Sequence, residues 1–423
     1  MIDGKETKME RAMLVALKLN KESKHIVEEH LDELEMLADT AGAETIIKVI
    51  QDRPTPDKAH YVGKGKAEEL AELVELNEIV IVIFDADLSP TQVRNLEKML
   101  DVKILDRSGL ILDIFASHAK TKQAKTQVEL AQLQYMLPRL TRAWTHLSKQ
   151  HGGIGTKGPG ETQIETDRRL IRTRITKLKE LLRKIENQNK TKSMKRQDFL
   201  TASLVGYTNA GKSTLINFLT DADLLAENKL FATLDSTTRS FELEKNKKVL
   251  ISDTVGFIRK LPHNLVASFK TTLNVVKDAD IIIHVVDISH PFFEDHIKVV
   301  DETLEELGAK EKTQIIIFNK IDVLEDKDRI SYVKNKYTNS ILISAERGIN
   351  ITEVKEGLLQ LYENSYKEKK IVLDMTQSKL VAQIHQIADV LSTEYIEDKV
   401  EMTYKTNSAN HSKIDKLIEN SEN

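Results

Sequence analysis

GYTNAGKST, at Gly206–Thr214, fits the pattern G-x-x-x-x-G-K-[ST], and the segments around it decide the fold. The apolar stretch Phe199–Val205 comes before it and predicts a buried strand, whereas Ser213–Leu219 follows it with helical spacing. A glycine-rich turn between a strand and a helix lets backbone N–H groups surround phosphates, and the helix N-terminus adds positive potential. The sequence therefore predicts a phosphate-binding P-loop in an α/β domain.

Two side chains of this loop have predicted chemical roles. Lys212 is expected to neutralise the β- and γ-phosphates of a nucleotide and to be catalytic. Ser213 is expected to place its hydroxyl on Mg²⁺. The other predicted nucleotide contacts of the loop are Gly206, Tyr207, Thr208, Asn209, Ala210 and Gly211.

A second phosphate motif, DTVG at Asp253–Gly256, follows the strand candidate Val249–Ser252. A carboxylate at the end of a buried strand can hold the Mg²⁺ shell through water, which is the role predicted for Asp253. Gly256 can offer its N–H to the γ-phosphate. Thr254 and Val255 complete this predicted binding segment. The tetrapeptide D-x-x-G is common in proteins, so this prediction depends on its position after the P-loop.

NKID, at Asn319–Asp322, ends the strand candidate Gln314–Phe318 and concerns the base. Guanine presents N1–H and an amine as two parallel donors, which one carboxylate accepts together, whereas adenine has no such pair. We therefore predict that Asp322 selects guanine, because a buried carboxylate without matching donors costs binding free energy. Lys320 is expected to lay its stem along the base and Asn319 to brace the loops, with Ile321 between them and Asp322.

SAE, at Ser344–Glu346, follows the strand candidate Ser340–Ile343 and is expected to put a backbone N–H near guanine O6. The predicted contacts there are Ser344, Ala345 and Glu346. NKID alone is also typical of a surface turn. Its place after a P-loop and DTVG favours a GTP site with Mg²⁺.

These four segments resemble the GTPase motifs of the translation-factor branch of P-loop proteins. That branch has a switch segment whose Thr binds Mg²⁺, and the candidate is FATLDSTTR at Phe231–Arg239. Thr233 is predicted as the catalytic and metal-binding residue, with Thr237 and Thr238 as rivals. The neighbouring predicted contacts are Phe231, Ala232, Leu234 and Asp235. Many small GTPases follow D-x-x-G with a Gln that orients water, but this chain has Phe257.

Residues 1–116 predict a separate α/β subdomain with a mostly parallel sheet, because strand and helix patterns alternate. The predicted strands are Ala12–Leu19, Thr45–Gln51, Ile79–Phe84 and Val102–Asp106, and the predicted helices are His25–Ala41, Lys66–Leu76 and Pro90–Leu100. HYVGKGKAEEL, at His60–Leu70, lacks P-loop spacing. A structural turn is favoured there over an ATP site.

The middle of the chain is strongly basic, although the whole chain carries a net charge of −4. Residues 117–200 hold 19 Lys and Arg against 7 Asp and Glu, a net charge of +12. Ser117–Tyr135 and Glu161–Ile185 have helical patterns, and the second carries a coiled-coil seam of Ile164, Ile171, Ile175, Leu178, Leu182 and Ile185. We therefore predict an antiparallel helical hairpin over 117–190 with a polyanion partner.

The hairpin tip is rich in glycine. HGGIGTKGPGETQIETDRR, at His151–Arg169, holds five of the 16 glycines: Gly152, Gly153, Gly155, Gly158 and Gly160. Such a tip can approach a crowded surface closely. Phosphate backbones are then expected to contact Arg168, Arg169, Arg172 and Arg174.

The remaining chain predicts a linker at Gln188–Gln197, a GTPase domain over 199–366 and a small α+β domain over 367–423. In the last domain we predict a strand at Ile371–Met375, a helix at Ser378–Leu391, a strand at Lys399–Tyr404 and a closing helix. The absence of cysteine excludes disulfides, thiolate metal sites and cysteine nucleophiles. A charged N-terminus and short apolar runs predict a cytoplasmic protein, expected to be a monomer, with no integral membrane segment.

HGGIGTKGPGETQIETDRR, GYTNAGKST, LFATLDSTTR and DTVGFI together resemble the HflX family of bacterial GTPases. The resemblance implies a GTPase that binds the large ribosomal subunit, with the hairpin reaching rRNA near the peptidyl transferase centre. It also implies splitting of stalled or idle ribosomes, and a hydrophobic residue at position 257. A ribosome-assembly GTPase is the alternative. A signalling switch without an RNA partner is a third possibility, and the +12 segment argues against it.

Overall fold

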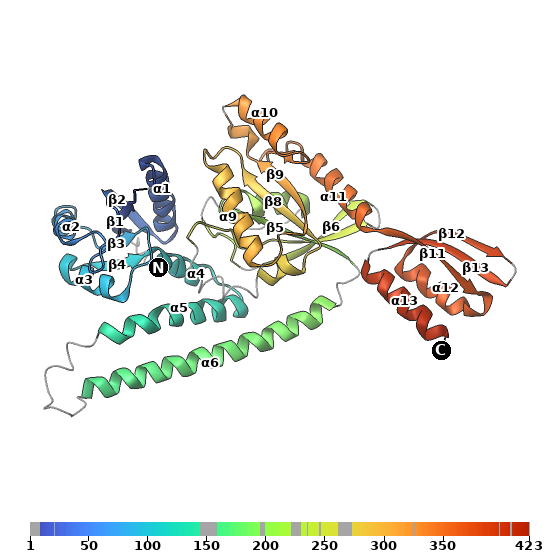
Figure 1. Ribbon diagram of the computed structural model, residues 1–423, viewed down its shortest axis with the longest axis horizontal. Helices are drawn as coiled ribbons and strands as arrows, with labels where there is room; N and C mark the ends of the chain where they lie inside the picture. The colour runs from blue at the N-terminus through green and yellow to red at the C-terminus, as the bar shows by residue number, and fades with distance from the viewer. Residues whose placement is uncertain are drawn as a thin grey trace, which may run out of the picture. The chain divides into compact units, whose positions relative to one another are not determined.

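The computed structural model describes residues 9–20, 22–143, 159–194, 199–220, 230–234, 236–244, 247–260, 273–324, 326–396, 398–406 and 408–422 (Figure 1). The chain forms two compact units. The first comprises Met1–Ile185 with Leu225–Asp235 and Val255–Leu273, and the second comprises Glu186–Leu224, Ser236–Thr254 and Asn274–Asn423. The two short segments of the first unit contain residues 231–235 of the predicted switch segment and residues 255–256 of DTVG.

The first unit contains a four-stranded sheet in the order β2-β1-β3-β4, in which every neighbouring pair is parallel. Its strands are β1 (Glu10–Lys18), β2 (Ala43–Asp52), β3 (Ile81–Phe84) and β4 (Lys103–Asp106). Its connecting helices are α1 (Lys24–Thr40), α2 (Lys64–Leu76) and α3 (Pro90–Leu100). The sheet is parallel because helices separate its strands, as the alternating pattern predicts.

One helix of this unit, α4 (Arg107–His118), was missing from the sequence prediction. Most of its side chains are buried, so it lacks the one-sided apolar pattern that reveals a surface helix. It follows β4 directly, and its N-cap is Asp106, whose side chain accepts a hydrogen bond from Gly109 N at 2.8 Å.

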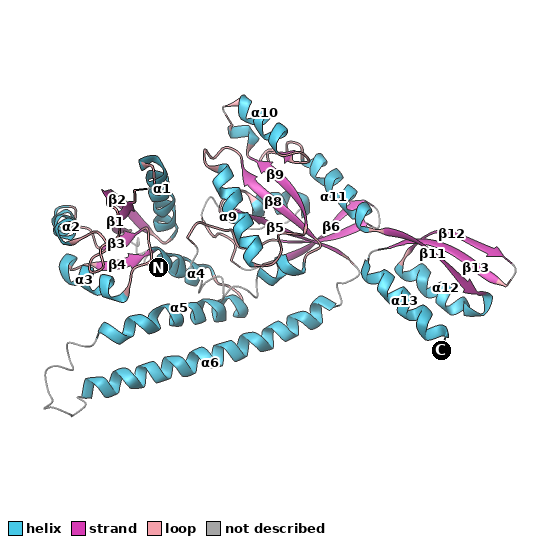
Figure 2. Cartoon of the chain, viewed as in Figure 1, coloured by secondary structure: helices cyan, strands magenta, loops and turns pink. Residues whose placement is uncertain are grey.

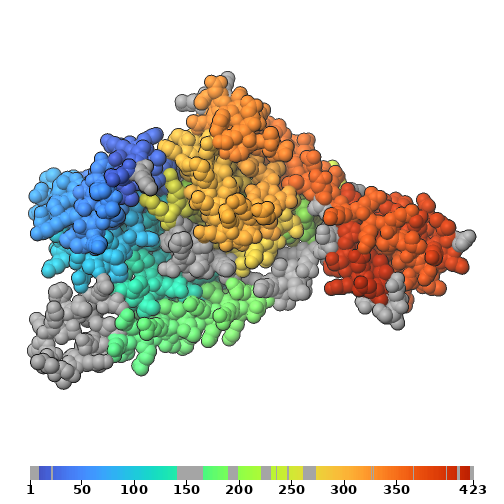
Figure 3. Space-filling model, in the orientation of Figure 1, coloured from blue at the N-terminus to red at the C-terminus, as the bar shows by residue number. Residues whose placement is uncertain are grey.

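The predicted hairpin consists of α5 (Lys122–Ala143) and α6 (Pro159–Met194), which lie side by side (Figure 3). Leu178 and Leu182 of the predicted seam are buried against Leu130 of α5. Residues 151–158 of the glycine-rich tip lie outside the described residues, and residues 159–169 belong to α6, with Gly160 in its first turn. The linker prediction is wrong for 188–194, because α6 continues through them. Polar composition does not distinguish an exposed helix from a linker.

The second unit contains a six-stranded sheet in the order β10-β9-β8-β5-β7-β6 (Figure 2). Its strands are β5 (Leu200–Gly206), β6 (Thr238–Glu244), β7 (Lys247–Ser252), β8 (Ile281–Asp287), β9 (Thr313–Asn319) and β10 (Ile341–Leu342). All pairs are parallel except β6 with β7, which is antiparallel. The named helices around this sheet are α7 (Lys212–Thr220), α9 (Phe293–Glu306), α10 (Lys327–Lys336) and α11 (Ile351–Ser365). The P-loop, DTVG, NKID and SAE motifs lie at the carboxyl ends of its parallel strands, where open α/β sheets bind ligands.

The C-terminal part folds as a three-stranded antiparallel sheet, β11-β13-β12, with two helices. Its elements are β11 (Lys367–Asp374), α12 (Ser378–Ile387), β12 (Asp389–Ile396), β13 (Lys399–Thr406) and α13 (Ser408–Glu422). The helix prediction Ser378–Leu391 is wrong at its end, because residues 389–391 already belong to β12. Val390 pairs there with Tyr404 of β13, and such non-local pairing overrides helical spacing.

The fold therefore confirms the predicted α/β class: a P-loop domain, a preceding α/β subdomain with a helical hairpin, and a small C-terminal α+β domain. In the described part of the chain, no helix combines the length and apolar character needed to cross a bilayer.

Candidate nucleotide-binding site

The P-loop connects the end of β5 to the start of α7, and two glycines are required by its close packing. A Cβ on Gly206 would lie 2.2 Å from the carbonyl oxygen of Val285 on β8. Gly211 has a φ of +88°, and its Cβ would lie 2.2 Å from Asn319 Nδ2. Tyr207 is fixed by its ring, which stacks on His296 with centroids 3.8 Å apart. Neighbouring residues therefore hold the loop backbone tightly in place.

Lys212 is buried at the start of α7, and its ammonium group is bonded to the loop itself. Lys212 Nζ donates to the carbonyl oxygens of Gly206 at 3.0 Å and Tyr207 at 2.8 Å. Burial lowers the pKa of Lys212 to about 8, although the nearby Asp253 charge opposes this shift. Burial thus works against the charged form of Lys212, and an anionic phosphate would favour that form.

Ser213 and Asp253 lie together where the sequence predicts Mg²⁺. Ser213 Oγ donates to Asp253 Oδ2 at 3.1 Å, and the Asp253 side chain is fully buried. Asp253 Oδ1 accepts a hydrogen bond from its neighbour Thr254 N at 3.0 Å. Thr208 Oγ1 is also buried in the P-loop, and it has no hydrogen-bond partner within the described residues. Hard oxygen donors of this kind fit Mg²⁺.

Asn319 links the phosphate side of the site to the base side. Its Nδ2 donates to Ala210 O in the P-loop at 2.9 Å, and its Oδ1 accepts from Ala345 N at 2.9 Å. Asn319 is buried at the end of β9, and Ala345 follows β10, the neighbouring strand. One amide thereby holds the P-loop and the SAE segment at a fixed separation.

Asp322 is the residue predicted to recognise the base, and its carboxylate is ionised. Its side chain is only 7% exposed. The hydroxyl of Ser344 lowers the pKa of Asp322, and Arg347, whose Nε lies 3.3 Å from Asp322 Oδ2, lowers it further. Ser344 is buried, Ile321 is partly buried and Glu346 is exposed. The carboxylate is thus held in the charged state that accepts two donors.

Lys320 has a left-handed backbone, with a φ of +68°, and its Nζ lies 2.7 Å from Asp287 Oδ2. Asp287 and Arg347 are two site residues that the sequence reasoning missed. Asp287 ends the buried strand β8, next to Asn319 at the end of β9. That position, shared with the predicted site residues, is the signal that could have identified it.

The sequence comparisons agree with this geometry. Three family models match the chain: GTP-binding GTPase N-terminal at residues 28–116, GTP-binding GTPase Middle Region at 118–196, and 50S ribosome-binding GTPase at 201–320. A GTPase HflX of Flavobacterium psychrophilum is 49% identical over 76% of this chain and 78% of its own length. A GTPase HflX of Escherichia coli is 42% identical over 88% and 87%.

The chain belongs to the HflX family of GTPases. It contains a 50S ribosome-binding GTPase domain and is a GTPase. A solved GTP-binding protein from Sulfolobus solfataricus, in complex with GDP, is 26% identical, covers 84% of this chain and 99% of that chain, and gives a TM-score of 0.45.

The structure of this HflX chain brings together the P-loop, Asp253, the NKID segment and the SAE segment in the second unit. Thr233, Val255 and Gly256 instead group with the first unit, and Asp235 lies outside the described residues. The roles of Thr233 and Gly256 toward phosphate and Mg²⁺ therefore stay predictions.

The rivals of Thr233 are engaged in the sheet of the second unit. The hydroxyls of Thr238 and Ser252 are 2.8 Å apart across the β6–β7 pair. The carbonyl oxygen of Thr237 accepts a hydrogen bond from Asp253 N at 2.9 Å. The first contact ties the Thr238 side chain to β7, whereas the second involves only the backbone of Thr237, whose buried hydroxyl has no hydrogen-bond partner within the described residues. The choice between Thr233, Thr237 and Thr238 stays a prediction.

Proposed function

We propose that this GTPase binds the large ribosomal subunit through the α5–α6 hairpin and uses GTP to split stalled or idle ribosomes into subunits. The observation that carries the proposal is the arginine-rich face of α6. A hollow of about 500 Å³ lies along this face and is lined by Glu165, Arg168, Arg169, Arg172, Thr173 and Thr176. Three arginines facing one open hollow suit the phosphates of rRNA.

Arg174 has a different environment from the other three arginines. Its Nε and Nη2 donate to the two carboxylate oxygens of Glu129 on α5 at 2.6 and 2.9 Å. A bidentate pair uses the guanidinium geometry that a phosphate would need. We therefore assign Arg174 to holding the two helices together, and the RNA contacts to Arg168, Arg169 and Arg172.

GTP hydrolysis is assigned to the P-loop and the switch residues. Lys212 neutralises the transferred phosphate, and the Gly256 N–H stabilises its developing charge. Ser213 and Thr233 would hold Mg²⁺ directly and Asp253 through water, and the ion supplies further charge neutralisation. Asp322 restricts the base to guanine.

Phe257 occupies the position after DTVG and is buried, with 2% of its surface exposed. A phenyl ring cannot orient the attacking water by hydrogen bonding. The free protein is therefore expected to hydrolyse GTP slowly, because orientation contributes strongly to such reactions. We propose that docking on the large subunit supplies the missing order, and that single-turnover hydrolysis accelerates when subunits are added.

The deciding experiment adds the protein and GTP to intact mature ribosomes and measures subunits by sedimentation. Splitting supports the rescue function. Mature ribosomes that stay intact, together with binding to immature large subunits, would instead support the assembly alternative.

A second experiment tests the surface. Replacing Arg168, Arg169 and Arg172 together with Gln is expected to weaken co-sedimentation with large subunits and to flatten its salt dependence. Arg174→Gln is the matched control, and it should leave the salt dependence close to that of the wild type. An unchanged salt slope in the triple variant contradicts the RNA-binding assignment.

A further inference from the structure

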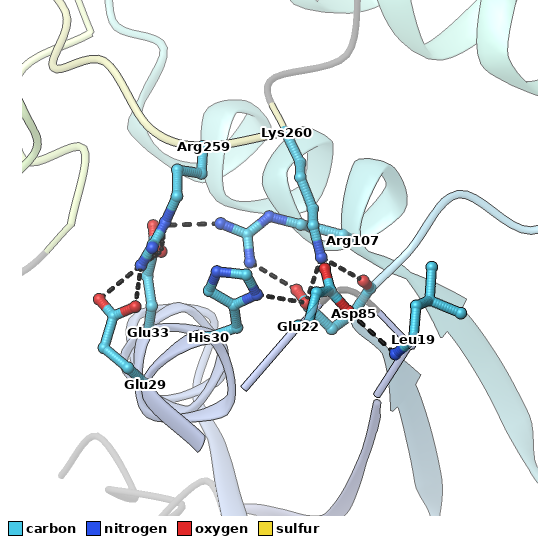
Figure 4. A network of polar contacts seen from close by, with 9 residues as sticks. All are labelled: Leu19, Glu22, Glu29, His30, Glu33, Asp85, Arg107, Arg259 and Lys260. Carbon is cyan, nitrogen blue, oxygen red and sulfur yellow. Dashed lines mark hydrogen bonds and ion pairs between the residues drawn. The ribbon is translucent and has the colours of Figure 1, made fainter. Parts of the chain in front are cut away.

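A buried charge cluster lies at the carboxyl ends of β3 and β4 in the first unit (Figure 4). Its centre is Arg107, the first residue of α4, whose side chain is 2% exposed. Arg107 Nη1 donates to Asp85 Oδ1 at 2.7 Å, and Nη2 donates to Glu33 Oε1 on α1 at 3.1 Å. This guanidinium therefore fixes two carboxylates from different elements.

The same carboxylates hold the segment that follows DTVG. Arg259 Nη2 pairs with Glu29 and lies 3.1 Å from Glu33 Oε2. Lys260 Nζ donates to Asp85 Oδ2 at 2.6 Å. Burial alone would raise the pKa of Asp85, but Arg107 and Lys260 hold it below its usual value. The ion pairs thus anchor the chain three and four residues after Gly256.

The residue before Arg107 anchors the hairpin. Asp106 is fully buried, and its carboxylate accepts hydrogen bonds from Tyr135 Oη and Arg139 Nη2 of α5, each at 2.6 Å. The Arg139 guanidinium also lies 3.4 Å from the centroid of the Tyr135 ring. The start of α4 is therefore joined to α5 through side chains as well as through the short α4–α5 connection.

The far end of α4 contacts the other predicted switch segment. The ring of Phe231 meets that of Phe115 edge to face, with centroids 4.7 Å apart. Phe231 is 2% exposed and has a left-handed φ of +57°, a conformation held by its surroundings. One short buried helix thus contacts the segment before Thr233 directly, and it is linked to the segment after Gly256 through the carboxylates of Asp85 and Glu33.

We propose that the adjacent residues Asp106 and Arg107 form a relay that couples the position of the hairpin to the segment 255–260. Because Arg107, Asp85 and Glu33 are buried, none of these three charges can be left unpaired without a large cost, so the network shifts between discrete arrangements. A movement of α5 that displaces Asp106 must also move Arg107, and with it the carboxylates that hold Arg259 and Lys260. This inference rests on the proposed function, because it makes hairpin docking the input and the GTPase switch the output.

The test uses the full-length protein and measures GTP and GDP affinities without ribosomes. Arg139→Gln acts on the hairpin side of the relay, and Arg259→Gln acts on the switch side. Each is expected to change the GTP-to-GDP affinity ratio by about fivefold, in the same direction, because coupling of sites is typically of this size. The double variant should show no further change, since both substitutions interrupt one relay.

Two further variants control the test. Lys48 of β2 forms ion pairs with Asp32 and Glu35, which lie on α1 but outside the charge cluster. Lys48→Gln removes these pairs and should leave the GTP-to-GDP affinity ratio unchanged. Tyr135→Phe removes one hydrogen bond to Asp106 with little change in packing, and should shift the ratio in the direction of Arg139→Gln. It also provides the hairpin-side measurement if Arg139→Gln fails to fold.

The relay is refuted if the hairpin variants leave the ratio at the wild-type value, or if the double variant multiplies the single effects. The proposed function is judged separately, by co-sedimentation of the wild-type protein with large subunits. If the wild-type protein does not co-sediment with large subunits, the proposed function is wrong. The coupling of affinities measured in the free protein would still stand.

Discussion

The nucleotide site of the second unit and the charge cluster of the first unit are both built at the carboxyl ends of parallel strands. In the nucleotide site, each motif is a short run of neighbouring residues, and many contacts use the backbone, as when Lys212 donates to two loop carbonyls. In the cluster, side chains pair with side chains, and Arg259 lies 230 positions from Glu29.

This difference distinguishes a site that binds a ligand from a cluster that joins parts of the chain to one another. The ammonium group of Lys212 is bonded to carbonyl oxygens, so a phosphate can supply the negative charge. The cations of the cluster already face carboxylates, because Arg107 meets Asp85 and Glu33. The first region therefore has capacity for an outside anion, whereas the second is neutralised internally and can transmit movement.

Asp322→Asn is expected to have the largest effect on the nucleotide site. It turns one acceptor oxygen into a donor that faces the donors of guanine, while the C2 carbonyl of xanthine accepts instead. The preference for GTP over xanthosine triphosphate should fall by about a thousandfold, as expected when two charge-assisted hydrogen bonds are lost.

Competition binding with the two nucleotides measures this preference. Asp328→Asn, an exposed carboxylate close by in the sequence, is the matched control and should keep the wild-type preference. Unchanged GTP affinity in the Asp322 variant would remove the assignment of base recognition.

Lys212→Ala should lower GTP affinity by about a hundredfold, because it removes a buried cation that pairs with phosphate. The thermal unfolding midpoint should not fall, since burial of this ammonium is itself unfavourable. Lys260→Ala sharpens the comparison, because it removes a partner of buried Asp85 and should lower the midpoint instead. Wild-type GTP hydrolysis by the Lys212 variant would place the active site elsewhere.

Gly211→Ala tests whether nucleotide binding depends on the backbone conformation of the P-loop. The new Cβ would strain a left-handed residue and displace Asn319, so nucleotide affinity should fall by about tenfold. Gly65→Ala in α2 is the control, because its Cβ would meet no atom within 4 Å. Equal nucleotide affinity in the two variants would contradict a rigid loop.

The smallest expected effect concerns His30 in the charge cluster. Burial, followed by the charges of Arg259 and Lys260, lowers the pKa of His30 from 6.5 to about 4. The unfolded chain binds this proton below about pH 6.5 and the folded chain only below about pH 4, so His30 reduces stability as the pH falls through that interval.

Urea unfolding at a series of pH values tests this effect. His30→Gln should show a smaller loss of stability between pH 6.5 and 4 than the wild type. Arg259→Gln should raise the pKa of His30, observed by NMR of its imidazole ring. Identical pH slopes in wild type and His30→Gln would show that this histidine does not report on the cluster.

The P-loop, the parallel sheets and the basic hairpin could be predicted from the sequence alone, and the base-reading role of NKID stays a prediction. Each of these depends on residues close together in the chain, so periodicity and short motifs reveal them. Asp287 could also have been predicted, because it ends a buried strand. Asp253 and Asn319 lie at the ends of buried strands in the same way.

The remaining features depend on contacts between distant parts of the chain. The helix α4 is buried on nearly all sides and has no one-sided pattern, and β12 exists because it pairs with β13. The cluster around Arg107 needs α1, β3, α4 and the segment after DTVG at one place. A charged residue in a sequence does not show whether it meets water or a buried opposite charge, because that choice depends on side chains brought together from distant parts of the chain.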